Sequence, residues 1–432
     1  MTLMTTLISA GVRTTNALGS MLDVMGVPPI SLREGDLLNA ARRSTGLSDF
    51  GDDDFREPLR RLLSCLETEA DLTLLGRVAA RRDLTGLLIS RLLLEEDRKR
   101  FPGIAAERIT APIFIIGLPR TGSTALHHLL AQDPETRAAL AWEVMYPSPP
   151  PRRATYSTDP RIARAAGQLR WLDWLAPDFR AIHPVGAQLP LECIAIMSAS
   201  FRAMRFQTTY NVPGYEKWLA EQDMRPAYAF HRRFLQHLQW GAPGAQWVLK
   251  APSHVFAFDA LLDTYPDARI VQTHRDPVAA VASVASLSSV LHRAFSRRRE
   301  PTLFGREVTD RWSAGLNRTV ELRRIGRVAA DRLADVHHHE LLADPMGVVK
   351  RIYGQFQMPL TVAAADRMRT FLAENPPGKH GRHRYALDTF GLDAQDLAKR
   401  FKTYCEHFGV RPEGRPRLTH PLSSSVGGRD RT

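Results

Sequence analysis

Cysteine is scarce in this chain of 432 residues, and long apolar runs are missing. The three cysteines, Cys65, Cys193 and Cys405, lie far apart without C-x-x-C spacing, which argues against a disulfide framework and against a zinc site. Polar residues interrupt the mildly apolar stretch from Leu3 to Val12, and nothing approaches the roughly 20 apolar residues that span a bilayer. We therefore expect a cytoplasmic protein without integral membrane association.

Acidic residues are also in the minority, since 46 of them face 58 lysines and arginines and leave a net charge of +12. This excess suits a polyanionic small molecule, and it would attract nucleic acid or an anionic membrane equally well. Apolar residues make up 44% of the chain, enough to build a large core. Composition therefore predicts a basic, enzyme-sized protein and leaves its ligand open.

The composition divides the chain into three parts. Residues 1–110 carry leucines at helical spacing and are predicted to form a helical N-terminal region. A core is predicted over residues 111–410, with a helical insertion over about 144–241 that would form the acceptor side of a binding site. Residues 411–432 are rich in proline, serine, glycine and arginine, so we expect a disordered tail there.

An apolar run followed by a glycine-containing loop is the most informative segment of the chain. The run Ile113 to Ile116 predicts a buried strand, Gly117 ends it, and Ala125 to Ala131 predicts a helix. The loop G-L-P-R-T-G-S-T therefore lies at a helix N-terminus, where free backbone N–H groups and the helix dipole favour an anion. The side chains that could also donate to such an anion are those of Arg120, Ser123 and Thr124.

The spacing of this loop matches the Walker A loop of nucleotide triphosphatases, but the lysine of that motif is absent. Gly117 and Gly122 stand at the Walker spacing. Ser123 occupies the place of the lysine, and the cation of the loop has moved three residues earlier to Arg120. This displacement argues against ATP hydrolysis.

Two further strands are predicted downstream, over Trp247 to Lys250 and over Arg269 to Thr273. The second runs into H-R-D-P, whose first three residues also match the catalytic loop of protein kinases. A kinase would need an asparagine five residues after the aspartate, where Val281 stands, so we reject that interpretation. Asp276 and Pro277 are instead predicted to cap and begin the next helix.

The order of three motifs resembles the sulfotransferase family, and its bacterial branch in particular. The motifs are P-R-T-G-S-T after the first strand, then L-K-A-P-S-H, then H-R-D-P with Ser283 eight residues after its arginine. The resemblance covers about Ala111 to Leu392. It implies an α/β P-loop-like three-layer fold with a parallel sheet, and 3′-phosphoadenosine 5′-phosphosulfate (PAPS) as the co-substrate, without a metal.

The same resemblance implies which residues would bind the donor. Arg275 and Ser283 would bind its 3′-phosphate, a dianion that a guanidinium can bind with two parallel hydrogen bonds. A late basic stretch resembles the loop that folds over this phosphate in the family, which makes Lys379, Gly381 and Arg382 candidates. The loop after the first strand would bind the 5′-phosphosulfate through Pro119, Arg120, Thr121, Gly122, Ser123 and Thr124.

Sulfuryl transfer to a hydroxyl, which we favour over an amine as the acceptor group, needs a base, stabilisation of the leaving phosphate and in-line placement of the two oxygens. By the resemblance, Arg120 would stabilise the leaving group and Lys250 would serve as a second cation. Glu143 is the first candidate for the base, because the catalytic glutamate of tyrosylprotein sulfotransferases follows the loop helix in a similar way. The alternatives are His254, then Glu192, and as a lesser possibility His183.

Three adjacent histidines, His337 to His339, invite a metal site, which we reject. Asp335 to His339 is predicted to be a strand, in which consecutive side chains point to opposite faces and cannot converge on one ion. We expect no metal in this protein.

The sequence thus predicts a PAPS-dependent sulfotransferase that acts on a small, apolar, hydroxylated acceptor. Tryptophans and methionines of the insertion favour the apolar acceptor, although such residues belong to the core more often than to pocket walls. A nucleotide kinase or triphosphatase, and a non-catalytic module that binds nucleotide or nucleic acid, are the alternatives. We expect no nucleic-acid partner, and the sequence does not decide the oligomeric state.

Overall fold

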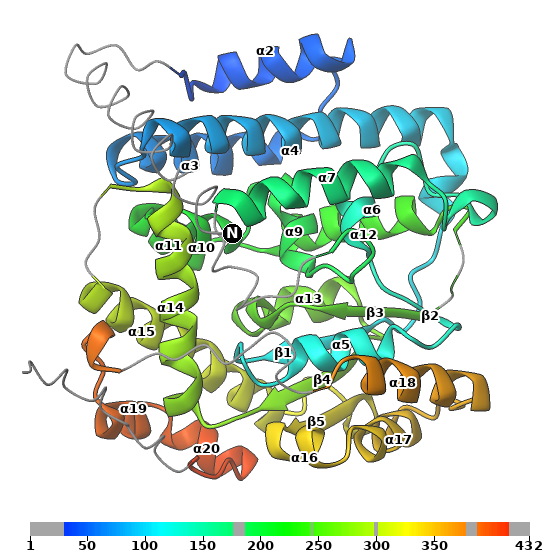
Figure 1. Ribbon diagram of the computed structural model, residues 1–432, viewed down its shortest axis with the longest axis vertical. Helices are drawn as coiled ribbons and strands as arrows, with labels where there is room; N and C mark the ends of the chain where they lie inside the picture. The colour runs from blue at the N-terminus through cyan, green and yellow to red at the C-terminus, as the bar shows by residue number, and fades with distance from the viewer. Residues whose placement is uncertain are drawn as a thin grey trace, which may run out of the picture.

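The computed structural model describes residues 30–175, 186–242, 244, 246–297, 301–376 and 387–413. Figure 1 shows a central sheet with helices packed around it and a further helical layer beyond them. Several predicted features lie outside the described residues: Lys379, Gly381, Arg382, His183 and all but the first three residues of the predicted tail.

The described strands form one parallel sheet in the order β2-β3-β1-β4-β5. β1 lies in the middle, and it pairs Ile115 with Lys250 on one side and Gly117 with Thr273 on the other. The strands predicted at β1, β3 and β4 and the α/β fold with a parallel sheet are confirmed, whereas β2 is too short to give a sequence pattern. The strands are β1 (Ile113–Gly117), β2 (Thr136–Arg137), β3 (Gln246–Lys250), β4 (Arg269–His274) and β5 (Leu333–His337).

Both faces of the sheet are buried, as expected for parallel strands. Phe114 and Ile116 of β1 belong to one hydrophobic cluster, together with side chains of α12 (Arg225–Gln239) and α13 (Phe258–Thr264). Ile113 and Ile115 point the other way and pack with α5 (Ser123–Leu130), α17 (Pro345–Gln355) and α18 (Val362–Glu374). Side chains of β1 alternate between the two faces of the sheet, so the strand packs against a layer of helices on each side.

The N-terminal part is helical and packs on the core. Its described helices are α2 (Glu34–Thr45), α3 (Arg56–Thr68) and α4 (Leu74–Arg100). Thr73 caps α4, because its hydroxyl accepts the backbone N–H of Gly76 at 3.0 Å. α2 packs along α4, and both cross the top of the molecule in Figure 1.

Helices also fill the segment between β2 and β3, where the helical insertion over about 144–241 is predicted. Its tryptophans Trp218 and Trp240 are half-buried and pack against the core and against Gly103 respectively. The described helices here are α6 (Ala141–Met145), α7 (Pro160–Leu175), α9 (Cys193–Met197), α10 (Arg205–Thr209), α11 (Pro213–Ala220) and α12.

α14 (Pro277–Phe295) links the sheet to the N-terminal helices. Asp276 accepts the backbone N–H of Val278, which confirms the predicted cap. At the other end, the carbonyl of Phe295 accepts the backbone N–H of Thr73 at 2.9 Å. Among the described residues, α14 is the one helix long and apolar enough to span a bilayer, and 67% of its apolar window is buried inside the protein.

The strand predicted over Asp335 to His339 ends earlier. β5 stops at His337, and His338 begins a helix, so the argument from alternating strand positions was wrong for the last two histidines. The described chain contains no group of three His, Cys, Asp or Glu side chains that could hold a metal ion. The remaining helices are α15 (Pro301–Arg324), α16 (His338–Ala343), α19 (Ala394–Arg400) and α20 (Lys402–Phe408).

Candidate active site

The loop between β1 and α5 begins with a backbone that requires glycine. Gly117 has φ of +127°, and a Cβ on it would lie 2.4 Å from the carbonyl oxygen of Thr273 in β4. Gly122, with φ of +86°, directly precedes the first turn of α5. The N-terminus of α5 therefore opens at the carboxyl edge of the sheet, where the backbone N–H groups of its first turn are available to an anion.

Thr121 holds this loop in place from the inside. It is fully buried, its hydroxyl donates to the carbonyl of Leu118 at 2.7 Å, and it lies 2.6 Å from the hydroxyl of Thr273. The Thr121 side chain therefore serves the loop itself and not a ligand. Arg120, in contrast, is exposed, and its φ of +69° is an uncommon value for a residue with a side chain.

Arg275 follows β4 at the same edge of the sheet. Its guanidinium donates to the backbone carbonyl of Arg120 at 2.9 Å, so the two predicted donor-binding elements are in contact. It also donates to both carboxylate oxygens of Glu413, at 2.7 and 2.8 Å, and this contact lowers the pKa of Glu413 below its ordinary value. The Glu413 carboxylate thus makes with Arg275 the bidentate contact through which a guanidinium can also bind a phosphate.

Ser283 lies on α14, about two turns from its start. Its side chain is fully buried, and its hydroxyl has no hydrogen-bond partner within the described part of the chain. Buried polar groups are normally paired, so a hydroxyl in this state is suited to bind a ligand or a water molecule. The next residue, Val284, lines the cavity described below.

A cavity of about 2080 Å³ opens at this edge of the sheet. It exceeds the roughly 300–1,000 Å³ of pockets for drug-sized ligands, so it has room for more than one such molecule. Apolar walls come from the insertion, for example Met145, Leu191 and Ile194. The predicted donor-binding residues that line it are Pro119, Arg120, Gly122, Ser123, Thr124 and Arg275.

Lys250 ends β3 beside the loop. Its ammonium group donates to the hydroxyl of Thr124 at 3.0 Å and forms an ion pair with Glu192. Lys250 is buried, whereas 21% of the Glu192 side chain stays exposed, and both residues line the cavity. A cation, a hydroxyl and a carboxylate therefore meet where the loop, the sheet and the insertion converge.

Glu143, the first candidate for the base, does not line the cavity. It is fully buried, where it accepts from Arg137 at 2.6 Å and from the backbone N–H of Leu140 at 2.9 Å. Burial raises the pKa of Glu143, and the neighbouring Arg137 opposes that shift. This geometry is that of an ion pair that fixes the first turn of α6.

His254, the second candidate, does not line the cavity either. Its Nδ1 lies 2.7 Å from the hydroxyl of Tyr228, and its ring packs edge-on against Phe114 with the ring centroids 5.1 Å apart. Burial lowers the pKa of His254 well below its ordinary value. In this position the imidazole belongs to the core beneath the sheet edge.

Two contributors to the site were missed because they come from distant parts of the chain. Glu413 contacts Arg275 across 138 residues, and α4 lines the cavity from a segment that precedes the predicted core. The pair of Lys250 and Glu192 spans 58 residues. Such contacts form only through tertiary packing, so no local sequence pattern predicts them.

The match of a protein family covers the strands and the loop at the sheet edge of this site, but neither α4 nor Glu413. Residues 112–362, more than half of the chain, match the model of the sulfotransferase family. The chain belongs to this family and is a sulfotransferase, which confirms the resemblance inferred from the three motifs.

The chain is similar to solved mycobacterial structures and to a curated mycobacterial enzyme. Sulfotransferase STF1 from Mycobacterium tuberculosis H37Rv shares 36% identity, with a TM-score of 0.77 over 85% of this chain and 98% of that chain. Sulfotransferase STF9 from Mycobacterium avium shares 32% identity, with a TM-score of 0.81 over 89% and 99% of the two chains. The omega-hydroxy-beta-dihydromenaquinone-9 sulfotransferase Stf3 of Mycobacterium bovis is 25% identical over 295 residues, which are 66% of this chain and 72% of that protein.

Proposed function

We propose that this protein transfers a sulfuryl group from PAPS to a hydroxyl group of an apolar small molecule, in the cytoplasm and without a metal. One observation carries the proposal. The loop after β1, Lys250 at the end of β3 and Arg275 after β4 converge on one edge of the sheet around a large cavity. Open α/β sheets bind ligands at this edge, and sulfotransferases generally take their sulfuryl group from PAPS.

The donor fits the polar groups at this edge. The N–H groups at the start of α5 suit the 5′-phosphosulfate, and Arg120 and Thr124 add side-chain donors on the cavity. Arg275 suits the 3′-phosphate, because it already binds an anionic group, the Glu413 carboxylate, in a two-pronged contact. The hydroxyl of Ser283, which has no hydrogen-bond partner among the described residues, supports the same assignment.

The transfer forms a bond between the acceptor oxygen and sulfur while the bond from sulfur to the bridging phosphate oxygen breaks. Negative charge then develops on the leaving phosphate, where Lys250 and Arg120 can stabilise it. The proton of the acceptor hydroxyl needs a base on the cavity. We assign this role to Glu192, because Glu143 and His254 are buried away from the cavity whereas Glu192 lines it next to Lys250.

An apolar alcohol is the acceptor that the cavity favours. Leu189, Leu191 and Ile194, which surround Glu192 in sequence, line the cavity and present aliphatic surface close to the proposed base. The name of the relative Stf3 describes an acceptor of this kind, a menaquinone with a hydroxyl group. Apolar surface beside a single polar reacting end matches such a molecule.

Calorimetric titration with adenosine 3′,5′-bisphosphate tests the donor, in parallel with ADP and ATP, each in EDTA and again with Mg²⁺. The bisphosphate carries the 3′-phosphate that Arg275 and Ser283 would bind, whereas ADP and ATP lack it. We expect tight binding of the bisphosphate alone, independent of Mg²⁺. Preference for ATP with Mg²⁺, or no binding of any nucleotide, would overturn the proposal in favour of a kinase or a non-catalytic protein.

A further inference from the structure

α4 turns a broad surface toward the cavity. Six of its lining positions recur every three or four residues and form a stripe along the helix, and Val78, Arg81, Asp83, Thr85, Leu87 and Ser90 line the cavity beside this stripe. At 1.5 Å per residue the stripe is about 27 Å long, and apart from one arginine its residues are small or apolar, whereas four of the six positions beside it are polar or charged. The positions of the stripe are Leu75, Ala79, Arg82, Gly86, Ile89 and Leu93.

α14 connects this stripe to the donor side. The helix begins two residues after Arg275, and the carbonyl of its last residue, Phe295, bonds to the residue that caps α4. Between these ends, Leu287 and Leu291 line the same cavity as the stripe. The cavity is therefore continuous from the sheet edge to α4, with apolar side chains along its length.

Gly86 lies in the middle of the stripe and has open space in front of it. No atom lies within 4 Å of a Cβ built on Gly86. A glycine inside a helix is less stable than alanine, so the helix itself gains nothing from it. A side chain at this position would project into the cavity and narrow it.

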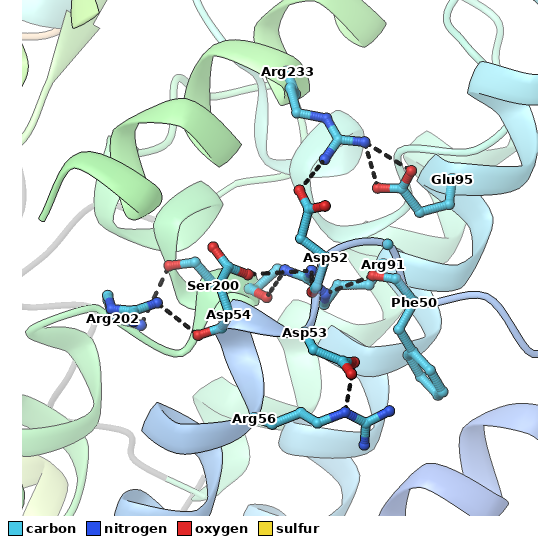
Figure 2. A network of polar contacts seen from close by, with 12 residues as sticks. Phe50, Asp52, Asp53, Asp54, Arg56, Arg91, Glu95, Ser200, Arg202 and Arg233 are labelled. Carbon is cyan, nitrogen blue, oxygen red and sulfur yellow. Dashed lines mark hydrogen bonds and ion pairs between the residues drawn. The ribbon is translucent and has the colours of Figure 1, made fainter.

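The opposite face of α4 is clamped to the insertion (Figure 2). Glu95 accepts two hydrogen bonds from Arg233 of α12, both at 2.7 Å. The guanidinium of Arg91 is buried and donates at 3.0 to 3.1 Å to three backbone carbonyl groups, those of Phe50, Asp52 and Ala199. These contacts fix the distance between α4 and the insertion, and thus the width available to a ligand.

We propose that α4 is the wall along which a long acceptor chain lies, and that Gly86 sets the bulk and length that this chain can have. The inference rests on the proposed function and narrows its substrate class to long-chain primary alcohols. The hydroxyl of such an alcohol reaches Glu192, and its alkyl chain covers the apolar stripe, which removes both surfaces from water. α4 precedes residues 112–362, so the family match does not account for this wall.

Binding of radiolabelled 1-hexadecanol and 1-hexanol to the full-length protein, measured by equilibrium dialysis, tests this inference. We expect the parent to bind hexadecanol saturably and more than about tenfold more tightly than hexanol, because the longer chain buries more methylene groups. Gly86→Leu should lower the hexadecanol affinity about tenfold or more and leave that for hexanol unchanged. Gly86→Ala should have a smaller effect in the same direction.

Gly354→Leu is the matched control. Gly354 also lies within a helix, α17, has no atom within 4 Å of a built Cβ, and does not line the cavity. Leucine favours the helix over glycine at both positions, and thermal unfolding verifies that both variants fold. Absence of saturable hexadecanol binding by the parent, or equal losses in Gly86→Leu and Gly354→Leu, would overturn the inference.

The two proposals can fail separately. If the parent does not bind the bisphosphate, the proposed donor is contradicted, and the comparison of the two alcohols still tests the role of α4. Tight bisphosphate binding with no preference for hexadecanol leaves the donor in place and removes the role of α4.

Discussion

The proposed donor side of the cavity, at the loop after β1 and Arg275, and its proposed acceptor side, at the insertion and α4, are held together in different ways. On the donor side the backbone itself is fixed, because Gly117 packs against the carbonyl of Thr273 and the buried hydroxyl of Thr121 locks the loop. On the acceptor side the walls are helices, and their positions depend on packing and on the Arg91 clamp. A charged ligand needs polar groups at fixed positions, whereas an apolar chain needs only surface of the right length and width.

Glu192, where the two sides meet, should show the largest effect. Glu192→Gln keeps the shape of the side chain and removes the proposed base, so kcat should fall about 10²- to 10⁴-fold. Binding of adenosine 3′,5′-bisphosphate should stay nearly unchanged. Single-turnover transfer from PAPS, followed by calorimetry with the bisphosphate, separates the two quantities.

Glu143→Gln is the matched control for Glu192→Gln, because it makes the same change in an acid that does not line the cavity. It breaks the buried ion pair with Arg137 and should lower the free energy of unfolding by about 3 kcal/mol. The protein that remains folded should turn over at the parental rate. A folded Glu143→Gln variant without turnover would return the role of base to Glu143.

Arg91, whose hydrogen bonds hold α4 against the insertion, should show the next largest effect. Arg91→Met leaves three carbonyl groups without their donor, two of them buried, and should lower the free energy of unfolding by about 3 kcal/mol. Arg60→Met is the control, because Arg60 is 60% exposed and its ion pair with Glu34 should contribute less than about 1 kcal/mol. Chemical denaturation of both variants measures this difference, and equal losses would refute the clamp.

Arg275→Ala should weaken binding on the donor side only. Loss of the proposed contacts to the 3′-phosphate should lower the bisphosphate affinity about 10- to 100-fold. ADP, which lacks this phosphate, should lose far less affinity, so the ratio of the two affinities is the quantity to measure by calorimetry. A parallel loss for both nucleotides would mean that Arg275 supports the loop through its contact with the Arg120 carbonyl and does not bind the phosphate.

The smallest effect is expected at Glu413, whose carboxylate holds the position proposed for the phosphate. Glu413→Gln removes this competition at neutral pH and should raise the bisphosphate affinity about two- to fivefold. Arg275 lowers the pKa of Glu413, so the ion pair persists through neutral pH and is lost as the pH falls through that lowered value. The advantage of Glu413→Gln should therefore shrink toward acidic pH, and an advantage that grows there would contradict the competition.

The donor side could largely be predicted from the sequence, because its motifs are local. A strand, a glycine turn and a helix within 18 residues are enough to define the loop at β1, and Asp276 and Pro277 mark the start of α14. Thr121 shows the limit of this reasoning. The motif includes it, but only the three-dimensional contacts with Leu118 and Thr273 reveal that its hydroxyl serves the loop.

The acceptor side could not be predicted in the same way. Glu143 follows the loop helix at a suggestive distance along the chain, but burial beside Arg137 keeps it from the cavity. Glu192 lies 58 residues from Lys250, so only the fold brings the two together. The stripe on α4 is a regular helical pattern, and its sequence does not tell whether it faces a cavity or the core.

Transfer of radiolabel from PAPS to 1-hexadecanol is the measurement that tests sulfuryl transfer in this cavity most directly. The full-length protein is incubated with sulfur-labelled PAPS and the alcohol in EDTA, and the organic product is separated from the donor. We predict labelled hexadecyl sulfate with the parent and almost none with Glu192→Gln. Label that stays on the donor, together with phosphate transfer from ATP in Mg²⁺, would contradict sulfuryl transfer in this cavity.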